Sequence, residues 1–105
     1  MVQKKDLEIM KSFKEDVSKK IPLKKLILFG SRAKGKLHKW SDFDILLVSN
    51  KFRKINSFKR CSVLYDYWHY DYPVDFLCYT PEEFNKLKNK ITIVKEAVSN
   101  GIVIK

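Results

Sequence analysis

Two aspartates, Asp42 and Asp44, begin an otherwise apolar run that continues to Val48. Side chains alternate along a β-strand, so residues two positions apart point to the same face. Two carboxylates on one face repel each other unless a cation lies between them, which makes the pair a candidate metal site. Taken alone, the Asp-x-Asp pattern is more typical of a solvated strand end, or of an Asp42 side chain that caps a helix.

A turn with two glycines precedes these acids and reads Gly30-Ser31-Arg32-Ala33-Lys34-Gly35. A glycine that closes a strand lets the backbone approach a ligand closely, and the amides after it can bind phosphate at a helix N-terminus. The Ser31 hydroxyl is a further donor, and Arg32 and Lys34 bring positive charge. The turn therefore predicts a phosphate site, although an isolated Gly-Ser pair also fits an ordinary turn.

A third acid, Asp75, lies inside another apolar run over residues 74–79. An isolated acid is costly there unless it is paired with a base or bound to a metal, and one of the many lysines is the simplest partner. If the strand that contains Asp75 lies beside the strand of Asp44, the acids approach one another. Three carboxylates opposite a phosphate-binding turn form a two-metal site for phosphoryl chemistry.

The spacing of these features is more specific than any of them alone. Ten residues separate Ser31 from Asp42, with an apolar strand pattern on either side. Residues 29–35 and 40–48 together, followed by Asp75, resemble the signature of the DNA polymerase β-like nucleotidyltransferase superfamily. Within it, the chain resembles the minimal nucleotidyltransferases, single-domain proteins often paired with a HEPN partner.

The resemblance implies a role for each motif residue. Gly30 and Ser31 would hold the triphosphate of ATP or another nucleoside triphosphate. Arg32 and Lys34 would either neutralise phosphate charge or be ordinary solvated side chains. Asp42 and Asp44 would bind two Mg²⁺ ions, and Asp75 would hold the catalytic ion and help to deprotonate the acceptor. The resemblance also implies transfer of AMP to a tyrosine of a HEPN toxin, which would make this chain an antitoxin.

The elements that must position these residues follow from the periodicity of apolar side chains and from Gly, Pro and capping signals. We predict helices over residues 4–20, 56–70, 81–89 and 91–99, and strands over residues 24–30, 42–49, 74–79 and 102–104. This order indicates one α/β (α+β) domain over residues 1–105, with a small mixed β-sheet and helices packed mainly on one face. The resemblance implies the polymerase β-like fold.

The composition leaves several properties open. A net charge of +10 attracts polyanions, so a basic nucleic-acid-binding protein is one alternative, and a non-catalytic antitoxin or binding module that acts by contact is another. Cys61 and Cys78 are expected to be two buried thiols rather than a zinc site or a disulfide. We expect a cytoplasmic protein, because no signal peptide or membrane span is recognisable. The sequence allows a homo-oligomer.

Overall fold

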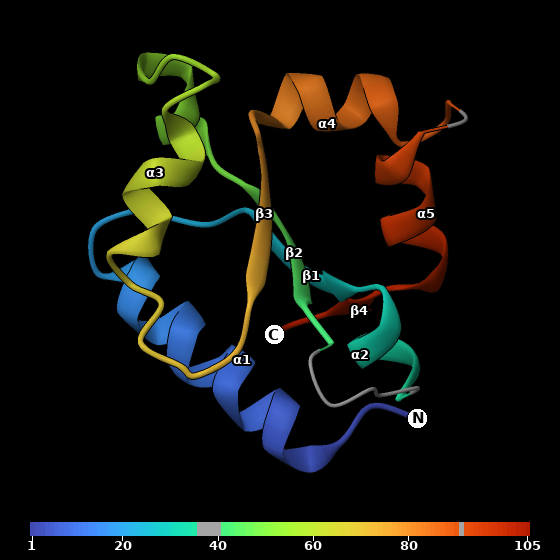
Figure 1. The fold of residues 1–105 in the computed structure, drawn as a ribbon. Helices are drawn as coiled ribbons and strands as arrows, with labels where there is room; N and C mark the ends of the chain where they lie inside the picture. The colour runs from blue at the N-terminus through green and yellow to red at the C-terminus, as the bar shows by residue number, and fades with distance from the viewer. Residues whose placement is uncertain (36–40, 91) are drawn as a thin grey trace.

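The computed structural model describes residues 1–35, 41–90 and 92–105 of the chain (Figure 1). Trp40 and Ile91, which fall within the motif and a predicted helix, lie outside the described residues. The elements in chain order are α1 (Lys4–Ser18), β1 (Lys25–Phe29), α2 (Ser31–Lys34), β2 (Phe43–Val48), the 3₁₀ helix η1 (Asn50–Lys54), α3 (Arg60–Tyr65), β3 (Val74–Tyr79), α4 (Pro81–Leu87), α5 (Ile93–Asn100) and β4 (Ile102–Val103).

The four strands form one mixed sheet in the order β3-β2-β1-β4. β1 runs antiparallel to both β2 and β4, whereas β2 and β3 are parallel. A parallel pair needs a long crossover, and η1 and α3 provide it here. The predicted mixed sheet and the α/β class are therefore confirmed.

The helices are divided between the two faces of the sheet, which differs from the prediction that they pack mainly on one face. α1 and α3 lie on one side and α4 and α5 on the other (Figure 1). The reason is that the central strands are apolar on both faces. Leu26 and Leu28 join the core under α1, while Ile27 and Phe29 join a second core under α5. A strand buried on both faces reads as a continuous apolar run, so its sequence does not reveal how helices are shared between the faces.

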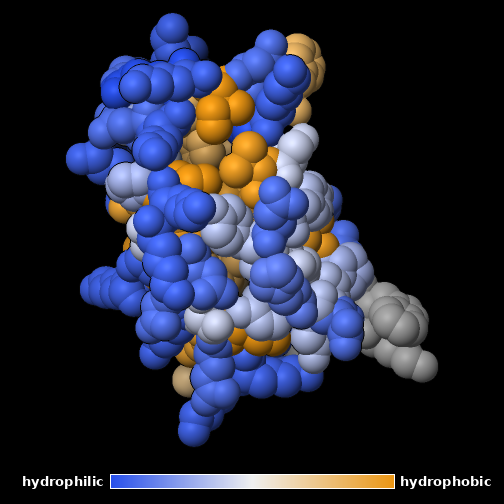
Figure 2. All heavy atoms as spheres, turned by 90° about the vertical axis from the view of Figure 1, so that its left-hand side faces the viewer, coloured by the Kyte–Doolittle hydropathy of each residue, from blue (hydrophilic) through white to orange (hydrophobic). Residues whose placement is uncertain are grey.

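α1 covers one core with a regular stripe of apolar side chains. Met10, Phe13 and Val17 are fully buried at helical spacing. The outward side of α1 and α3 is predominantly hydrophilic (Figure 2). None of the helices in the described part of the chain combines the length and the apolar character needed to cross a membrane.

The predicted helix over residues 56–70 is shorter in the structure, and η1 before it is not anticipated from the sequence. α3 ends at Tyr65, and the chain then turns so that the partly buried Trp68 packs against the core. The Trp68 ring lies 5.4 Å from Phe13 and 5.1 Å from Phe43, with its indole nitrogen donating to Tyr72 O at 2.9 Å. Aromatic burial thus outweighs continuation of the helix.

α3 packs beside β3, which is an end strand of the sheet. Three α3 side chains donate hydrogen bonds to alternate carbonyl groups of that strand. The pairs are Arg60 Nη1 with Cys78 O at 3.3 Å, Cys61 Sγ with Phe76 O at 3.1 Å, and the Tyr65 hydroxyl with Val74 O at 3.3 Å. Alternate carbonyls point to the same side of a strand, so these three donors line the outer edge of β3.

Candidate active site

Two of the predicted carboxylates meet across the parallel strands β2 and β3. Asp44 and Asp75 are direct partners in the register, which confirms that the third strand lies beside the second. Asp44 lies two residues before Leu46 on β2, and Asp75 lies two residues before Leu77 on β3. Each acid therefore shares the face of its leucine, which packs in or against the core under α4 and α5. Asp44 is half-buried and Asp75 is exposed, so the pair opens toward solvent at one end of that face.

The glycine of the predicted phosphate turn lies against the same pair. Phe29 is the β1 partner of Asp44, so Gly30 follows directly beside that carboxylate. Gly30 has φ +75°, a conformation that other residues rarely adopt, and a Cβ on it would lie 2.3 Å from Asp44 Oδ2. Only glycine allows the turn to approach Asp44 this closely. The structure therefore places the turn and the acids in one site.

Ser31 and Lys34 lie at the surface of the short helix α2 that begins at the turn. The Ser31 side chain is exposed beside Gly30, and the first amides of a helix lack partners within the helix. Lys34 Nζ lies 3.8 Å from Glu96 Oε1, a pair in which both side chains are about half exposed. Ser31 is thus open to solvent beside the turn, whereas Lys34 is directed toward α5.

Arg32, which the sequence groups with the phosphate ligands, lies in the interior instead and is only 2% exposed. Its Nη1 donates to Asp6 Oδ1 at 3.1 Å, and its Nε donates to Ser41 O at 3.0 Å. The guanidinium carbon lies 4.3 Å from the centre of the Phe43 ring and 4.4 Å from that of Tyr72. Arg32 therefore joins α1 to the segments that lead into Asp42 and Asp75.

Sequence reasoning missed Asp6, the carboxylate that pairs with Arg32. Asp6 is fully buried although it is charged. A signal was present, because Asp6 lies one turn before Met10 on the buried stripe of α1. An acid on an apolar stripe needs a buried partner, and a buried arginine is the residue suited to that role.

Crowded carboxylates give the site its electrostatic character. Burial raises the pKa of Asp44 to about 6, and repulsion from Asp75 and Asp42 adds to that effect. A divalent cation would remove this repulsion, and carboxylate oxygens are the ligands that Mg²⁺ prefers. The donor set therefore fits a hard divalent ion.

The acids do not form a complete metal cage. Over residues 1–35, 41–90 and 92–105, no three His, Cys, Asp or Glu side chains are gathered closely enough to hold a metal on their own. Mg²⁺ is usually bound by one or two carboxylates together with substrate phosphates and water. An open carboxylate pair beside the predicted phosphate turn suits that mode of binding.

Comparison with known proteins gives a family match. A family model described as a nucleotidyltransferase domain matches residues 10–100 of the chain. No curated protein matches the sequence significantly.

Solved structures give several likenesses. A protein from Sulfolobus solfataricus, provisionally assigned as a nucleotidyltransferase, is 26% identical, with a TM-score of 0.65 over 92% of this chain and 77% of that chain. BolA1 from Arabidopsis thaliana is 18% identical, with a TM-score of 0.56 over 71% of this chain and 94% of that chain. A toxin–antitoxin structure with AMP-PNP is 24% identical, with a TM-score of 0.54 over 95% of this chain and 73% of that chain. The last two likenesses concern the fold alone, because one fold hosts unrelated functions.

Proposed function

The chain belongs to the nucleotidyltransferase domain family, and on that premise we propose that it transfers a nucleoside monophosphate, AMP from ATP, to a hydroxyl group. The observation that carries the proposal is the cross-strand pair Asp44–Asp75 directly beside the Gly30 turn. A phosphate-binding turn next to an acidic pair brings a triphosphate and its metal ions to the same place.

In this proposal each motif residue has one task. The backbone at Gly30 and the hydroxyl of Ser31 bind the triphosphate. Asp42, Asp44 and Asp75 would be the carboxylates that hold two Mg²⁺ ions when these are bound. Bound magnesium neutralises the charge that develops on the phosphate oxygens.

The reaction is a displacement at the α-phosphorus. The Asp75 carboxylate accepts the proton of the acceptor hydroxyl, and that oxygen then attacks the α-phosphorus. The bond between the α-phosphorus and the bridging oxygen breaks, and pyrophosphate leaves. Holding the reacting groups in place before the reaction lowers the barrier, because the acceptor and the phosphorus then react as parts of one complex.

We propose that the acceptor hydroxyl belongs to a tyrosine of a partner toxin of the HEPN class, so that the chain acts as an antitoxin. The support is the fold shared with a protein solved in a toxin–antitoxin complex with AMP-PNP, together with the motif spacing. A cytoplasmic location is part of this proposal, since ATP and Mg²⁺ are available there.

The experiment is a label-transfer assay with the partner encoded beside this chain. The protein is incubated with Mg²⁺, the partner and ATP labelled on the α-phosphate, and partner binding is measured separately. We expect label on the partner with the wild type and with Asp71→Asn, which removes an exposed acid outside the site, but none with Asp44→Asn. Neutralisation by contact replaces the proposal if wild type and both variants bind the partner tightly and none transfers label.

A further inference from the structure

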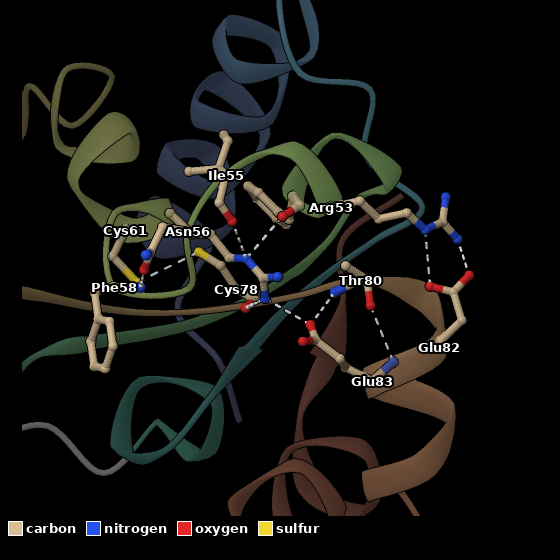
Figure 3. A network of polar contacts seen from close by, with 11 residues as sticks. Arg53, Ile55, Asn56, Phe58, Cys61, Cys78, Thr80, Glu82 and Glu83 are labelled. Atoms are coloured by element: carbon tan, nitrogen blue, oxygen red, sulfur yellow. Dashed lines mark hydrogen bonds and ion pairs between the residues drawn. The ribbon is translucent and has the colours of Figure 1, made fainter.

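The two cysteines of the chain, Cys61 and Cys78, lie together although they are 17 residues apart in the sequence. Cys61 lies in the first turn of α3 and Cys78 in β3, and their Sγ atoms are 3.7 Å apart (Figure 3). The sequence predicts two buried thiols with no disulfide. Burial is confirmed for Cys78, which is 8% exposed, and the structure adds that the thiols are in contact.

The pair can be reached from solvent. Cys61 is half-buried, and both cysteines line a cavity of about 300 Å³ at the outer side of β3. The remaining wall includes Arg60, Glu83 and Leu87. A small polar oxidant such as hydrogen peroxide is much smaller than this cavity, so it can reach Cys61 without unfolding of the chain.

Burial and a neighbouring charge act in opposite directions on the Cys78 thiol. Arg60 Nη1 donates to Cys78 O at 3.3 Å and to Glu83 Oε1 at 2.7 Å. Burial raises the pKa of the Cys78 thiol far above its usual range, and Cys61 adds to this, whereas Arg60 acts in the opposite direction. Cys61 is the more exposed of the two thiols, so it is the one that an oxidant meets first.

We propose that Cys61 and Cys78 form a modification site that a peroxide converts into a reversible disulfide between α3 and β3. The Cys61 thiolate attacks one peroxide oxygen, the O–O bond breaks, and Cys61 becomes a sulfenic acid with release of water. The Cys78 sulfur then attacks the Cys61 sulfur, and the S–O bond breaks with release of a second water. The two sulfurs lose two electrons to the peroxide, and both thiol protons end in water.

The geometry favours this second step over further oxidation. A disulfide needs a sulfur separation of about 2 Å, so the two atoms must approach by less than 2 Å from their present contact. The resulting bond ties α3 to the strand that also contains Asp75, and it restricts the unfolded chain between the two cysteines.

The test uses the full chain, whose only two thiols make the chemistry easy to count. The folded protein is treated with hydrogen peroxide, and the peroxide is then removed. The protein is unfolded and labelled with N-ethylmaleimide, and its mass is measured by mass spectrometry. We expect the treated protein to be lighter by two hydrogens and unlabelled, with both labels restored by dithiothreitol. Its thermal midpoint should rise by on the order of 10 °C.

Single substitutions provide matched controls. Cys61→Ser and Cys78→Ala each keep one thiol, so neither should form the intramolecular bond or show the rise in thermal midpoint. The proposal is overturned if the treated wild type keeps two labels, gains oxygen on each sulfur independently, or forms disulfide-linked dimers. The assay reads thiol chemistry alone, so its failure leaves nucleotidyl transfer untouched.

Discussion

Replacement of Asp44 by asparagine should stabilise the metal-free protein at neutral pH while it removes nucleotidyl transfer. Raising an aspartate pKa from its ordinary value of about 4 to about 6 corresponds to roughly 3 kcal/mol of unfavourable free energy for the charged form. The carboxylate is only half-buried, so solvent screening reduces the expected gain to about 1–2 kcal/mol.

The sign of the pH dependence follows from the direction of the shift. Between pH about 4 and about 6 the folded protein binds the Asp44 proton more tightly than the unfolded chain does. Asp44 therefore favours folding at low pH, and this contribution is lost as the pH rises through about 6. The advantage of Asp44→Asn should be absent near pH 3.5 and complete near pH 8.

Urea unfolding in EDTA at both pH values measures the effect, with Asp71→Asn as the control for a change of net charge. If Asp44→Asn has the same or a lower free energy of unfolding than the control at pH 8, the carboxylates are not in repulsive contact and the reasoning is refuted. Added Mg²⁺ should reverse the ranking, since an ion at a hundred times its dissociation constant stabilises the folded wild type by about 2.7 kcal/mol.

Three further substitutions test other parts of the site. Gly30→Ala should lower the free energy of unfolding by about 1–3 kcal/mol and reduce transfer, because it forces a Cβ into the Asp44 carboxylate at positive φ; an unchanged urea midpoint would contradict this. Arg32→Ala should lower the free energy of unfolding by about 3–5 kcal/mol, because it leaves the buried Asp6 carboxylate without its partner. Urea unfolding should show a loss of under about 1 kcal/mol for Lys19→Ala, which removes an exposed ion pair, and equal losses for the two variants would contradict this. Ser31→Ala should raise the KM for ATP several-fold without changing stability, and steady-state kinetics that show the same KM would remove Ser31 from the phosphate site.

Much of the site was accessible from the sequence because its geometry is set by strands. Side chains alternate along a strand, so Asp42 and Asp44 are expected on one face of it. The spacing between the Gly-Ser turn and these acids predicts the nucleotidyltransferase family, which the family match confirms. The pairing of Asp44 with Asp75 required only that the two strands be neighbours. These features depend on local periodicity and on one strand pairing.

Arg32 could not be assigned from the sequence, because its role depends on tertiary contacts. Beside a glycine turn, an arginine looks like a phosphate ligand. The fold instead surrounds it with Asp6, Phe43 and Tyr72, which come from three distant segments. The contact of Cys61 with Cys78 was hidden for the same reason, since it exists only where α3 meets β3.

The three donors from α3 along the outer edge of β3 have a consequence for assembly. An end strand usually offers its free carbonyl groups as a template for a strand of another molecule. Here the Arg60, Cys61 and Tyr65 side chains already occupy three of those carbonyls. A second copy or a partner cannot extend the sheet at β3 unless α3 first moves away. The edge of the sheet nearest Asp75 is thereby protected against strand pairing with another molecule, which is a common route to aggregation.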